Sequence, residues 1–134
     1  MRILIDINHP AHVHYFRNFS RIMEEKGHEI FFVSRNKEMA HRLLDLYGFT
    51  YLDRGKGKNG RFGKIYYLIY ANLKLLSIAR KIKPDLFLNF LHPYPSQVAR
   101  LLGRTSLVFS DTEHAKLHHR LTLPFATKIF TPSC

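Results

Sequence analysis

Short runs of apolar residues alternate along the chain with longer stretches in which apolar positions recur every three or four residues. Isoleucine, valine, leucine and phenylalanine dominate the short runs, a composition typical of buried strands. Six strands are expected, at residues 2–7, 29–34, 49–52, 85–90, 105–110 and 128–131. The stretches between them carry a helical period, so strands and helices follow each other in alternation.

Helices are predicted at residues 12–26, 36–47, 62–81 and 113–123, and a further short helix is expected after Pro93 and Pro95, ending at Gly103. Gly27 closes the first helix and Pro84 stops the longest one. The apolar residues of the longest helix fall on one stripe, which predicts a single apolar side. This stripe consists of Ile65, Leu68, Ile69, Leu75, Leu76, Ala79 and Ile82.

The alternation predicts the α/β fold class, with a Rossmann-like parallel sheet of about six strands and helices on both faces. The length of 134 residues fits one domain, residues 1–134. In such a sheet, ligands bind beyond the carboxyl ends of the strands. Functional residues are therefore expected in the loops that follow the strands, at 8–12, 34–36, after 53, 92–96 and 110–114.

Composition excludes several classes of protein. Hydrophobic residues make up 46% of the chain and charged residues 23%, a globular mix that excludes a disordered segment. The single cysteine, Cys134, excludes a disulfide-stabilised secreted scaffold and favours a cytoplasmic location. No apolar run approaches the roughly 20 residues of a membrane span. Residues 1–7 carry Asp6 within their apolar run and lack the cleavage site of a signal peptide.

Charge adds a prediction about partners. The chain has 21 basic and 10 acidic residues and a net charge of +11, which favours nucleic acid, anionic lipid or a phosphorylated substrate as partner. Residues 54–84 contain no acidic residue, so a glycine-containing loop (54–63) and the long helix after it carry most of the net charge. Their basic residues are Arg54, Lys56, Lys58, Arg61, Lys64, Lys74, Arg80, Lys81 and Lys83.

The basic helix also contains Tyr66, Tyr67 and Tyr70, and two interpretations of it stay open. A basic amphipathic surface with aromatic residues can lie on an anionic membrane. The helix can equally be an ordinary core-facing one whose outer side is cationic. Neither a helix-turn-helix pattern nor an aromatic platform supports nucleic-acid recognition.

The turn after the first strand disfavours two common cofactor chemistries. A dinucleotide-binding turn needs glycines so that the backbone can approach a pyrophosphate, and a P-loop needs a glycine-rich loop ending in lysine and serine or threonine. The turn here reads Asn8-His9-Pro10-Ala11-His12 and has no glycine. NAD-dependent redox chemistry and P-loop phosphate chemistry are therefore not expected.

The same turn concentrates polar groups that suit catalysis. His9 or His12 is a candidate general base, because a histidine changes its charge near neutral pH, and Asn8 is a candidate substrate contact. The alternative is that these histidines only satisfy local hydrogen bonds at the start of a helix. His12 and His14 are two residues apart on a helix, so their side chains diverge and no metal site is expected there.

Two further loops hold candidate residues. Asp111, Glu113 and His114 follow the fifth strand and suit acid–base work or the binding of sugar hydroxyls. Asp111 or Thr112 can equally cap a helix whose first turn holds Glu113. His92 and Ser96 follow the fourth strand and are candidate substrate contacts.

These motifs resemble a known family. The first eighteen residues, MRILIDINHPAHVHYFRN, resemble the start of the domain-of-unknown-function family 354. Gly27-His28-Glu29 and the segment FSDTEHA at 109–115 fit the same pattern, and the match covers nearly the whole chain. Members of that family look like two-domain glycosyltransferases of the GT-B type. They are also similar to UDP-N-acetylglucosamine 2-epimerase and to the enzyme that adds N-acetylglucosamine to the lipid-linked peptidoglycan precursor.

The resemblance implies roles for the candidate residues. In the GT-B architecture the N-terminal half binds the acceptor and the C-terminal half binds the nucleotide sugar. Glu113 would take the position of an active-site glutamate, and His9 and His12 would lie at the mouth of the cleft between the halves. The lipid-linked comparison would make the basic segment a membrane or lipid-phosphate contact, through Lys56, Lys58, Arg61 and Lys64.

Three hypotheses follow about function. The first is the acceptor-binding half of a glycosyltransferase whose donor is a UDP-sugar and whose acceptor is a sugar or a lipid-linked sugar. Without its nucleotide-sugar domain, this half is expected to be inactive. The second is a UDP-sugar 2-epimerase-like enzyme that uses Asp111 and Glu113 as acid and base. The third is a non-catalytic module that binds a polyanion or an anionic membrane surface, at the inner face of the membrane.

Overall fold

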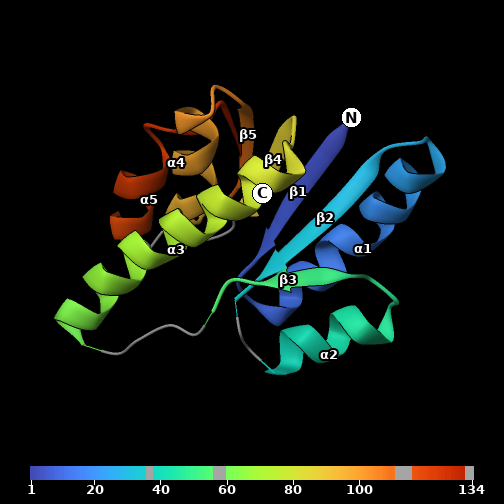
Figure 1. The fold of residues 1–134 in the computed structure, drawn as a ribbon, viewed down its shortest axis with the longest axis horizontal. Helices are drawn as coiled ribbons and strands as arrows, with labels where there is room; N and C mark the ends of the chain where they lie inside the picture. The colour runs from blue at the N-terminus through green and yellow to red at the C-terminus, as the bar shows by residue number, and fades with distance from the viewer. Residues whose placement is uncertain (36–37, 56–59, 111–115, 132–134) are drawn as a thin grey trace.

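The computed structural model describes residues 1–35, 38–55, 60–110 and 116–131 and shows the alternation of strands and helices (Figure 1). The strands are β1 (Arg2–Ile7), β2 (Glu29–Ser34), β3 (Tyr51–Asp53), β4 (Leu86–Phe90), β5 (Thr105–Phe109) and β6 (Lys128–Phe130). The helices are α1 (Pro10–Glu25), α2 (Glu38–Leu46), α3 (Arg61–Ile82), α4 (Pro93–Leu101) and α5 (Lys116–Thr122). The predicted fold class is confirmed.

Among the element boundaries that differ from the prediction, two have a clear physical reason. Helix α1 begins at Pro10, earlier than expected, because proline fits the first position of a helix, where its missing N–H needs no partner. Strand β3 begins at Tyr51 because the backbone of Phe49 is still hydrogen-bonded to the last turn of α2. The Phe49 N–H donates to the Leu44 carbonyl at 2.9 Å, and Gly48 turns the chain there with a φ of 73°.

All six strands are parallel, in the order β3-β2-β1-β4-β5-β6. Strand β1 lies in the centre, where Ile5 is paired with Phe32 on β2 and with Leu88 on β4. Because the strands are parallel, all of their carboxyl ends meet at one rim of the sheet.

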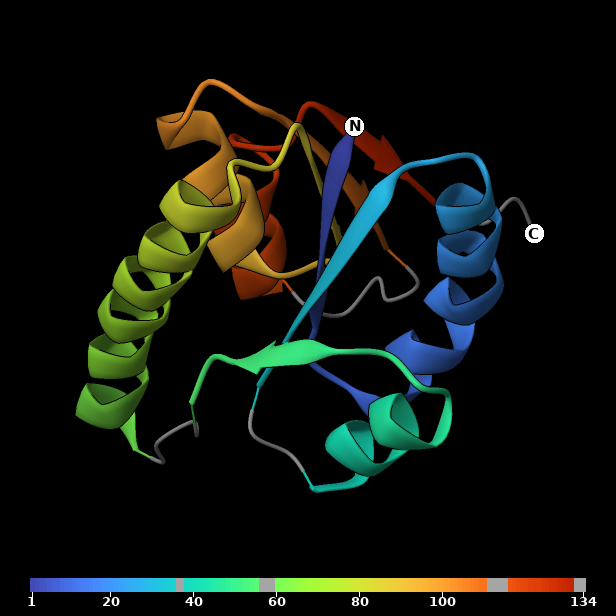
Figure 2. The same ribbon diagram turned by 45° about the vertical axis from the view of Figure 1, so that its right-hand side comes forward.

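Helices cover both faces of the sheet. Helices α1 and α2 lie on one face, and α3, α4 and α5 lie on the other (Figures 1 and 2). Side chains of β1 alternate between two cores, as expected for a strand that is buried on both faces. Ile3, Ile5 and Ile7 pack in the core that α1 and α2 cover, and Leu4 packs in the core under α3 and α4.

The buried side of α3 differs from the predicted apolar stripe. Tyr67, Ala71, Leu75 and Ala79 are its buried residues, each one turn after the last. Ile65 and Ile69, which were expected on the same apolar side as Leu75, are 53% and 58% exposed. The prediction was wrong because α3 carries apolar residues on both sides, and the side with the short alanine side chains is the one that packs on α4 and into the core.

The outer side of α3 consequently carries exposed apolar residues, which we call the α3 apolar row. Exposure of its members ranges from 53% at Ile65 to 86% at Phe62. The row consists of Phe62, Ile65, Tyr66, Ile69 and Leu73. Within the described ranges, no helix is both long enough and apolar enough to cross a membrane.

Candidate functional site

The strand order creates a crevice at the carboxyl rim of the sheet. Strand β1 is followed by α1 on one face, whereas its neighbour β4 is followed by α4 on the other face. The two loops therefore leave the rim in opposite directions, and such a switch point is where open α/β sheets bind ligands. Residues 8–9 and 91–92 form these two loops, so two of the loops predicted from the sequence meet at the switch point.

Three of the predicted histidines lie together there. The His12 ring lies 5.9 Å from the His9 ring and 6.4 Å from the His92 ring, measured between centroids. His12 also stacks on Phe90 at 4.6 Å. His92 is buried, His12 is partly buried and His9 is exposed, so the cluster runs from the protein interior to its surface.

Hydrogen bonds fix the orientation of two of these rings. Nδ1 of His9 accepts the N–H of Ala11 at 3.2 Å and caps α1, and Nδ1 of His12 accepts the N–H of Asn8 at 3.4 Å. A neutral imidazole whose Nδ1 accepts a hydrogen bond carries its proton on Nε2. In this arrangement each neutral ring is therefore a hydrogen-bond donor at Nε2.

Beneath the crevice lies an ion pair that the sequence analysis did not find. Arg54, directly after β3, and Asp6, on β1, are both fully buried. Nε of Arg54 lies 3.0 Å from Oδ1 of Asp6, and its Nη2 donates to Oδ2 at 3.1 Å. We call this two-point contact the Asp6–Arg54 pair. It joins the centre of the sheet to the start of the basic segment.

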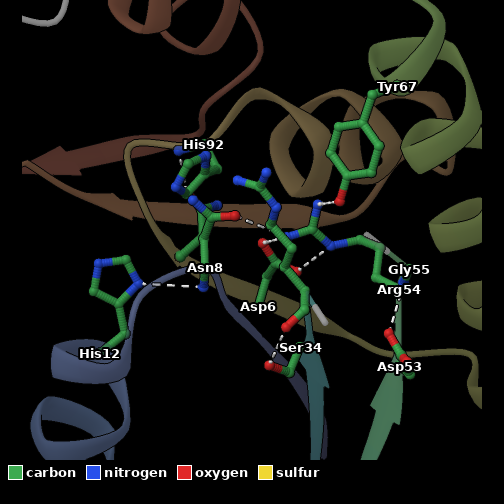
Figure 3. A network of polar contacts seen from close by, with 11 residues as sticks. Asp6, Asn8, His12, Ser34, Asp53, Arg54, Gly55, Tyr67 and His92 are labelled. Atoms are coloured by element: carbon green, nitrogen blue, oxygen red, sulfur yellow. Dashed lines mark hydrogen bonds and ion pairs between the residues drawn. The ribbon is translucent and has the colours of Figure 1, made fainter. Parts of the chain in front are cut away.

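Arg54 also reaches three other residues at the rim, two of which, Tyr67 and Asn8, are seen in Figure 3. Its Nη1 donates to the Tyr67 hydroxyl at 3.2 Å and its Nη2 to Oδ1 of Asn8 at 3.4 Å. Its guanidinium lies over the Tyr94 ring, 4.8 Å from the centroid. Arg54 therefore links β1, α3, α4 and the loop that holds the candidate residue Asn8.

The buried environment shifts the ionisation of the acidic groups. Burial raises the pKa of Asp6 above its ordinary value, while the charge and hydrogen bond of Arg54 act in the opposite direction. Burial also raises the pKa of Tyr67 and of Tyr94, and the nearby Arg54 and Arg35 oppose that rise. Both phenols are therefore neutral at physiological pH, and the Tyr67 hydroxyl can accept from Arg54.

Arg35 is a second arginine at the rim, also missed by the sequence analysis. It follows β2, and both of its backbone polar groups are hydrogen-bonded. Its N–H donates to the Ile7 carbonyl at 3.0 Å, and its carbonyl accepts the Ser34 hydroxyl at 3.0 Å. Its guanidinium lies 5.4 Å from the centroid of the Tyr67 ring.

The loop after β4 is held by a buried asparagine. Oδ1 of Asn89 accepts the N–H of His92 at 3.1 Å. Leu91, between them, has a φ of 38°, a left-handed conformation that side chains rarely adopt and that surrounding structure must maintain. Asn89 thus places His92 and the start of α4 at the switch point.

The other predicted residues do not join this cluster in the structure. Ser96 is fully buried, and its hydroxyl is hydrogen-bonded to that of Ser106 at 3.0 Å, away from the crevice. Arg61 and Lys64 lie exposed in the first turn of α3. The predicted residues outside the described part of the chain are Lys56, Lys58, Asp111, Glu113 and His114. Among the residues that are described, no group of three acidic, histidine or cysteine side chains is arranged to hold a metal ion.

Solved structures with the same fold include glycosyltransferases and UDP-GlcNAc 2-epimerases. MurG from Acinetobacter baumannii superposes with a TM-score of 0.82 at 15% sequence identity, covering 99% of this chain and 42% of that one. UDP-GlcNAc 2-epimerase from Neisseria meningitidis, solved with UDP-GlcNAc bound, gives a TM-score of 0.80 at 14% identity, covering 99% and 41%. At these identities the likeness shows the fold that GT-B glycosyltransferases and these epimerases share.

A relative found by sequence likewise matches this chain over only part of its own length. An uncharacterised protein of Methanocaldococcus jannaschii is 29% identical over 134 residues, which is 97% of this chain and 38% of that protein. The chain thus spans about two fifths of the length of the proteins that it matches. The sequence model of one family covers residues 1–134 in full. The chain therefore belongs to the family described as "Protein of unknown function (DUF354)".

Proposed function

We propose that this chain is the acceptor-binding half of a sugar-nucleotide-dependent glycosyltransferase. The observation that carries the proposal is the cluster of His9, His12 and His92 at the switch point, with ring centroids within 6.4 Å of His12. Support also comes from similarity to MurG and to UDP-GlcNAc 2-epimerase. A further domain would hold the donor, a UDP-sugar, since this chain has the length of only about two fifths of those proteins.

In the proposed reaction an acceptor hydroxyl attacks the anomeric carbon of the donor. A base takes the hydroxyl proton, the new C–O bond forms, and the bond to the nucleoside diphosphate breaks with its electron pair leaving on the diphosphate. His9 or His12 is the proposed base, and Asn8 and His92 are proposed acceptor contacts. Asp111, Glu113 and His114 are proposed to bind or polarise the sugar.

Hydrogen bonding sets a condition on the base. A histidine abstracts a proton through a nitrogen that carries none, and Nδ1 of both His9 and His12 is occupied as an acceptor. For His12 to act through Nε2, its proton must move to Nδ1 and the 3.4 Å bond from Asn8 must break. Without that change, His12 donates a hydrogen bond from Nε2 to an acceptor oxygen.

The test uses a protein that contains this chain together with any sequence encoded beyond residue 134. UDP release and the glycosylated product are measured with UDP-sugars and candidate acceptors. His12→Ala is expected to lower kcat by about 100-fold, a typical contribution of a positioned acid or base. His14→Ala is the matched control, because His14 lies on the same helix but is hydrogen-bonded to the Tyr47 hydroxyl at 3.0 Å, outside the cluster. Wild-type kcat in a His9→Ala, His12→Ala double variant contradicts the proposed base.

The same assay separates transfer from epimerisation. A transferase releases UDP only as the acceptor is glycosylated. An epimerase inverts a sugar carbon and needs no acceptor, and on this scaffold Asp111 and Glu113 would be its acid and base. An isomerised sugar formed in the absence of acceptor would therefore replace the transferase proposal with the epimerase one.

A second candidate function is contact with an anionic membrane surface. The α3 apolar row is exposed over its whole length, and Leu101 of α4 is 70% exposed beside it. A hollow of about 210 Å³ between the two helices is lined by Leu73, Leu76 and Leu101, together with Asn72, Gln97 and Val98. Exposed cationic side chains near the two ends of α3, Arg61 and Arg80, match the charge of anionic lipid.

Vesicle binding tests this second function. The protein is expected to sediment with vesicles that contain phosphatidylglycerol and to stay in solution with phosphatidylcholine alone. Binding should weaken as salt rises, since it combines apolar insertion with electrostatic attraction. Equal binding to both vesicle types, or tight binding to a single-stranded oligonucleotide with none to lipid, contradicts it.

A further inference from the structure

Two guanidinium groups contact Tyr67: Arg54 donates to its hydroxyl and Arg35 lies over its ring, and only one of the two has an ion-pair partner among the described residues. Arg54 is fully buried, and Asp6 cancels its charge through two contacts. Arg35 is only partly buried, and within the described residues no carboxylate forms an ion pair with it. Unlike Arg54, Arg35 therefore makes no ion pair with a described side chain, and it lies at the rim of the sheet where open α/β folds bind ligands.

The position of Arg35 follows from the register of the sheet. Ile7 on β1 is paired with Ser34 on β2, so Asn8 and Arg35 are the next residues beyond these two strand ends. Both reach the α3 face of the sheet, because Asn8 contacts Arg54 there and Arg35 lies over Tyr67. Arg35 is therefore the neighbour of a residue already proposed to contact the acceptor.

The contact with Tyr67 holds the Arg35 side chain without using its hydrogen-bond donors. A guanidinium that lies over an aromatic ring keeps its N–H groups directed outward in its own plane. These groups match the two oxygens of a phosphate or a carboxylate. The backbone of Arg35 is also held, by bonds to Ile7 and Ser34, so little order needs to be gained on binding.

The acidic groups nearby have partners of their own. Asp6 is engaged by Arg54, and Oδ1 of Asp53 accepts the N–H of Gly55 at 2.7 Å. Oδ1 of Asn8 accepts a hydrogen bond from Arg54, and this bond orients the Asn8 amide group. The N–H groups of that amide are the second donor that we assign to the site. Neither Asp6 nor Asp53 forms an ion pair with Arg35, so the Arg35 guanidinium is not occupied by a described carboxylate.

We propose that Arg35, with the amide group of Asn8 beside it, binds an oxyanion at the carboxyl rim. That the oxyanion belongs to the acceptor substrate rests on the proposed function. The binding site itself does not, and it is tested without any transfer reaction. The acceptor class that follows is a sugar or sugar conjugate bearing a phosphate or a carboxylate.

Titrations followed by amide NMR test the site at constant ionic strength. Inorganic phosphate, methyl phosphate and acetate are added separately, with chloride as the reference anion. Phosphate is expected to move the amide signals of Asn8 and Arg35 and the Arg35 Nε–H signal along one saturating curve. Saturation by both phosphates but not by acetate identifies a phosphorylated acceptor, and saturation by acetate as well identifies a carboxylate as a permitted group.

Variants separate this site from general attraction to a basic protein. Arg35→Gln should weaken phosphate binding at least tenfold, and Arg35→Lys should weaken it less because the charge stays. Arg17→Gln is the matched control: the Arg17 guanidinium also lies over a tyrosine ring, 4.7 Å from the centroid of Tyr47, but outside the rim, and phosphate binding should not change.

Three outcomes would overturn the proposal. They are unchanged phosphate affinity in Arg35→Gln, an equal loss in Arg17→Gln, and signal changes confined to exposed residues such as Arg61 and Lys64. The amide spectrum of Arg35→Gln without phosphate shows whether the variant is folded. Should it be unfolded, Arg35→Lys and Asn8→Ala carry the test, and unchanged affinity in both overturns the proposal. Loss of sugar transfer in the longer protein leaves this result unaffected, so the two proposals fail separately.

Discussion

Both sides of α3 carry large apolar residues, but only one side packs against the sheet and α4. The inner side presents Tyr67, Ala71, Leu75 and Ala79 to the core, all of them buried. The outer side presents the α3 apolar row, whose members are all more than half exposed. Hydrophobic pattern alone therefore does not decide which way this helix faces.

Two features of the inner side do decide it. Ala71 and Ala79 have short side chains and lie about two turns apart on this side, so α3 can pack closely on α4. Tyr67 adds a polar contact, since its hydroxyl accepts a hydrogen bond from the buried Arg54. The rotation of α3 is set by fit and by one buried polar anchor, and the outer side remains exposed.

The largest effect is expected from removing the anchor. Arg54→Ala leaves Asp6 buried without its partner and should lower the free energy of unfolding by about 3–5 kcal/mol. Urea unfolding followed by circular dichroism measures this change. Arg80→Ala, which removes an exposed cation at the other end of α3, should change stability by less than about 0.5 kcal/mol.

A double variant shows whether the loss comes from the orphaned charge. Asp6→Asn combined with Arg54→Met removes both charges, and it should be more stable than Arg54→Ala alone, because no unpaired buried charge remains. A double variant that is as unstable as the single one would mean that shape, and not charge, makes the Asp6–Arg54 pair important.

The next largest effect on stability is expected at Leu75, and Leu73 on the opposite side of α3 gives the comparison. Leu75→Ala deletes a fully buried side chain and should cost about 2–5 kcal/mol through lost burial and the cavity that remains. Leu73→Ala removes a side chain that is 62% exposed and should cost less than about 0.5 kcal/mol. Equal losses in the two variants would show that the outer side is also packed in solution.

The fold was predictable from sequence because its signals are local. The apolar runs at 2–7 and 29–34 and the helical periods between strands indicated that strands and helices alternate. Chains with this alternation form parallel sheets covered by helices, and the sheet is indeed parallel. The facing of α3 was not predictable, because apolar residues such as Ile65 and Leu75 occur on both of its sides. Which side is buried depends on contacts with α4 and the sheet that no local window contains.

The site was predictable in part for the same reason. Loops that follow parallel strands converge on one rim, so His9, His12 and His92 were expected there and lie there. Arg54 was missed because it stands among basic residues of a glycine-containing loop and its partner is 48 positions away. A signal was present in Asp6, since an acid within a buried apolar strand requires a partner.

A smaller effect is expected from single hydroxyl groups on neighbouring tyrosines. Tyr67→Phe removes the acceptor of the Arg54 Nη1 hydrogen bond and leaves a buried donor unsatisfied, which should cost about 1–3 kcal/mol. Tyr66→Phe changes an exposed residue of the α3 apolar row and should be neutral within about 0.5 kcal/mol. Unfolding by urea measures both, and a neutral Tyr67→Phe would remove the proposed anchor of α3.

The smallest effect on stability is expected from the outer side, where it should be accompanied by a loss of binding. Ile69→Ser replaces a side chain that is 58% exposed, so the free energy of unfolding should change by less than about 0.5 kcal/mol. Because an inserted isoleucine contributes about 1.5–3 kcal/mol when fully buried, the same change should weaken binding to phosphatidylglycerol vesicles by about tenfold. Ser77→Ala, on the same helix, is the control for nonspecific effects of substitution. Unchanged vesicle binding in a folded Ile69→Ser variant would mean that the outer side of α3 is exposed without contacting a membrane.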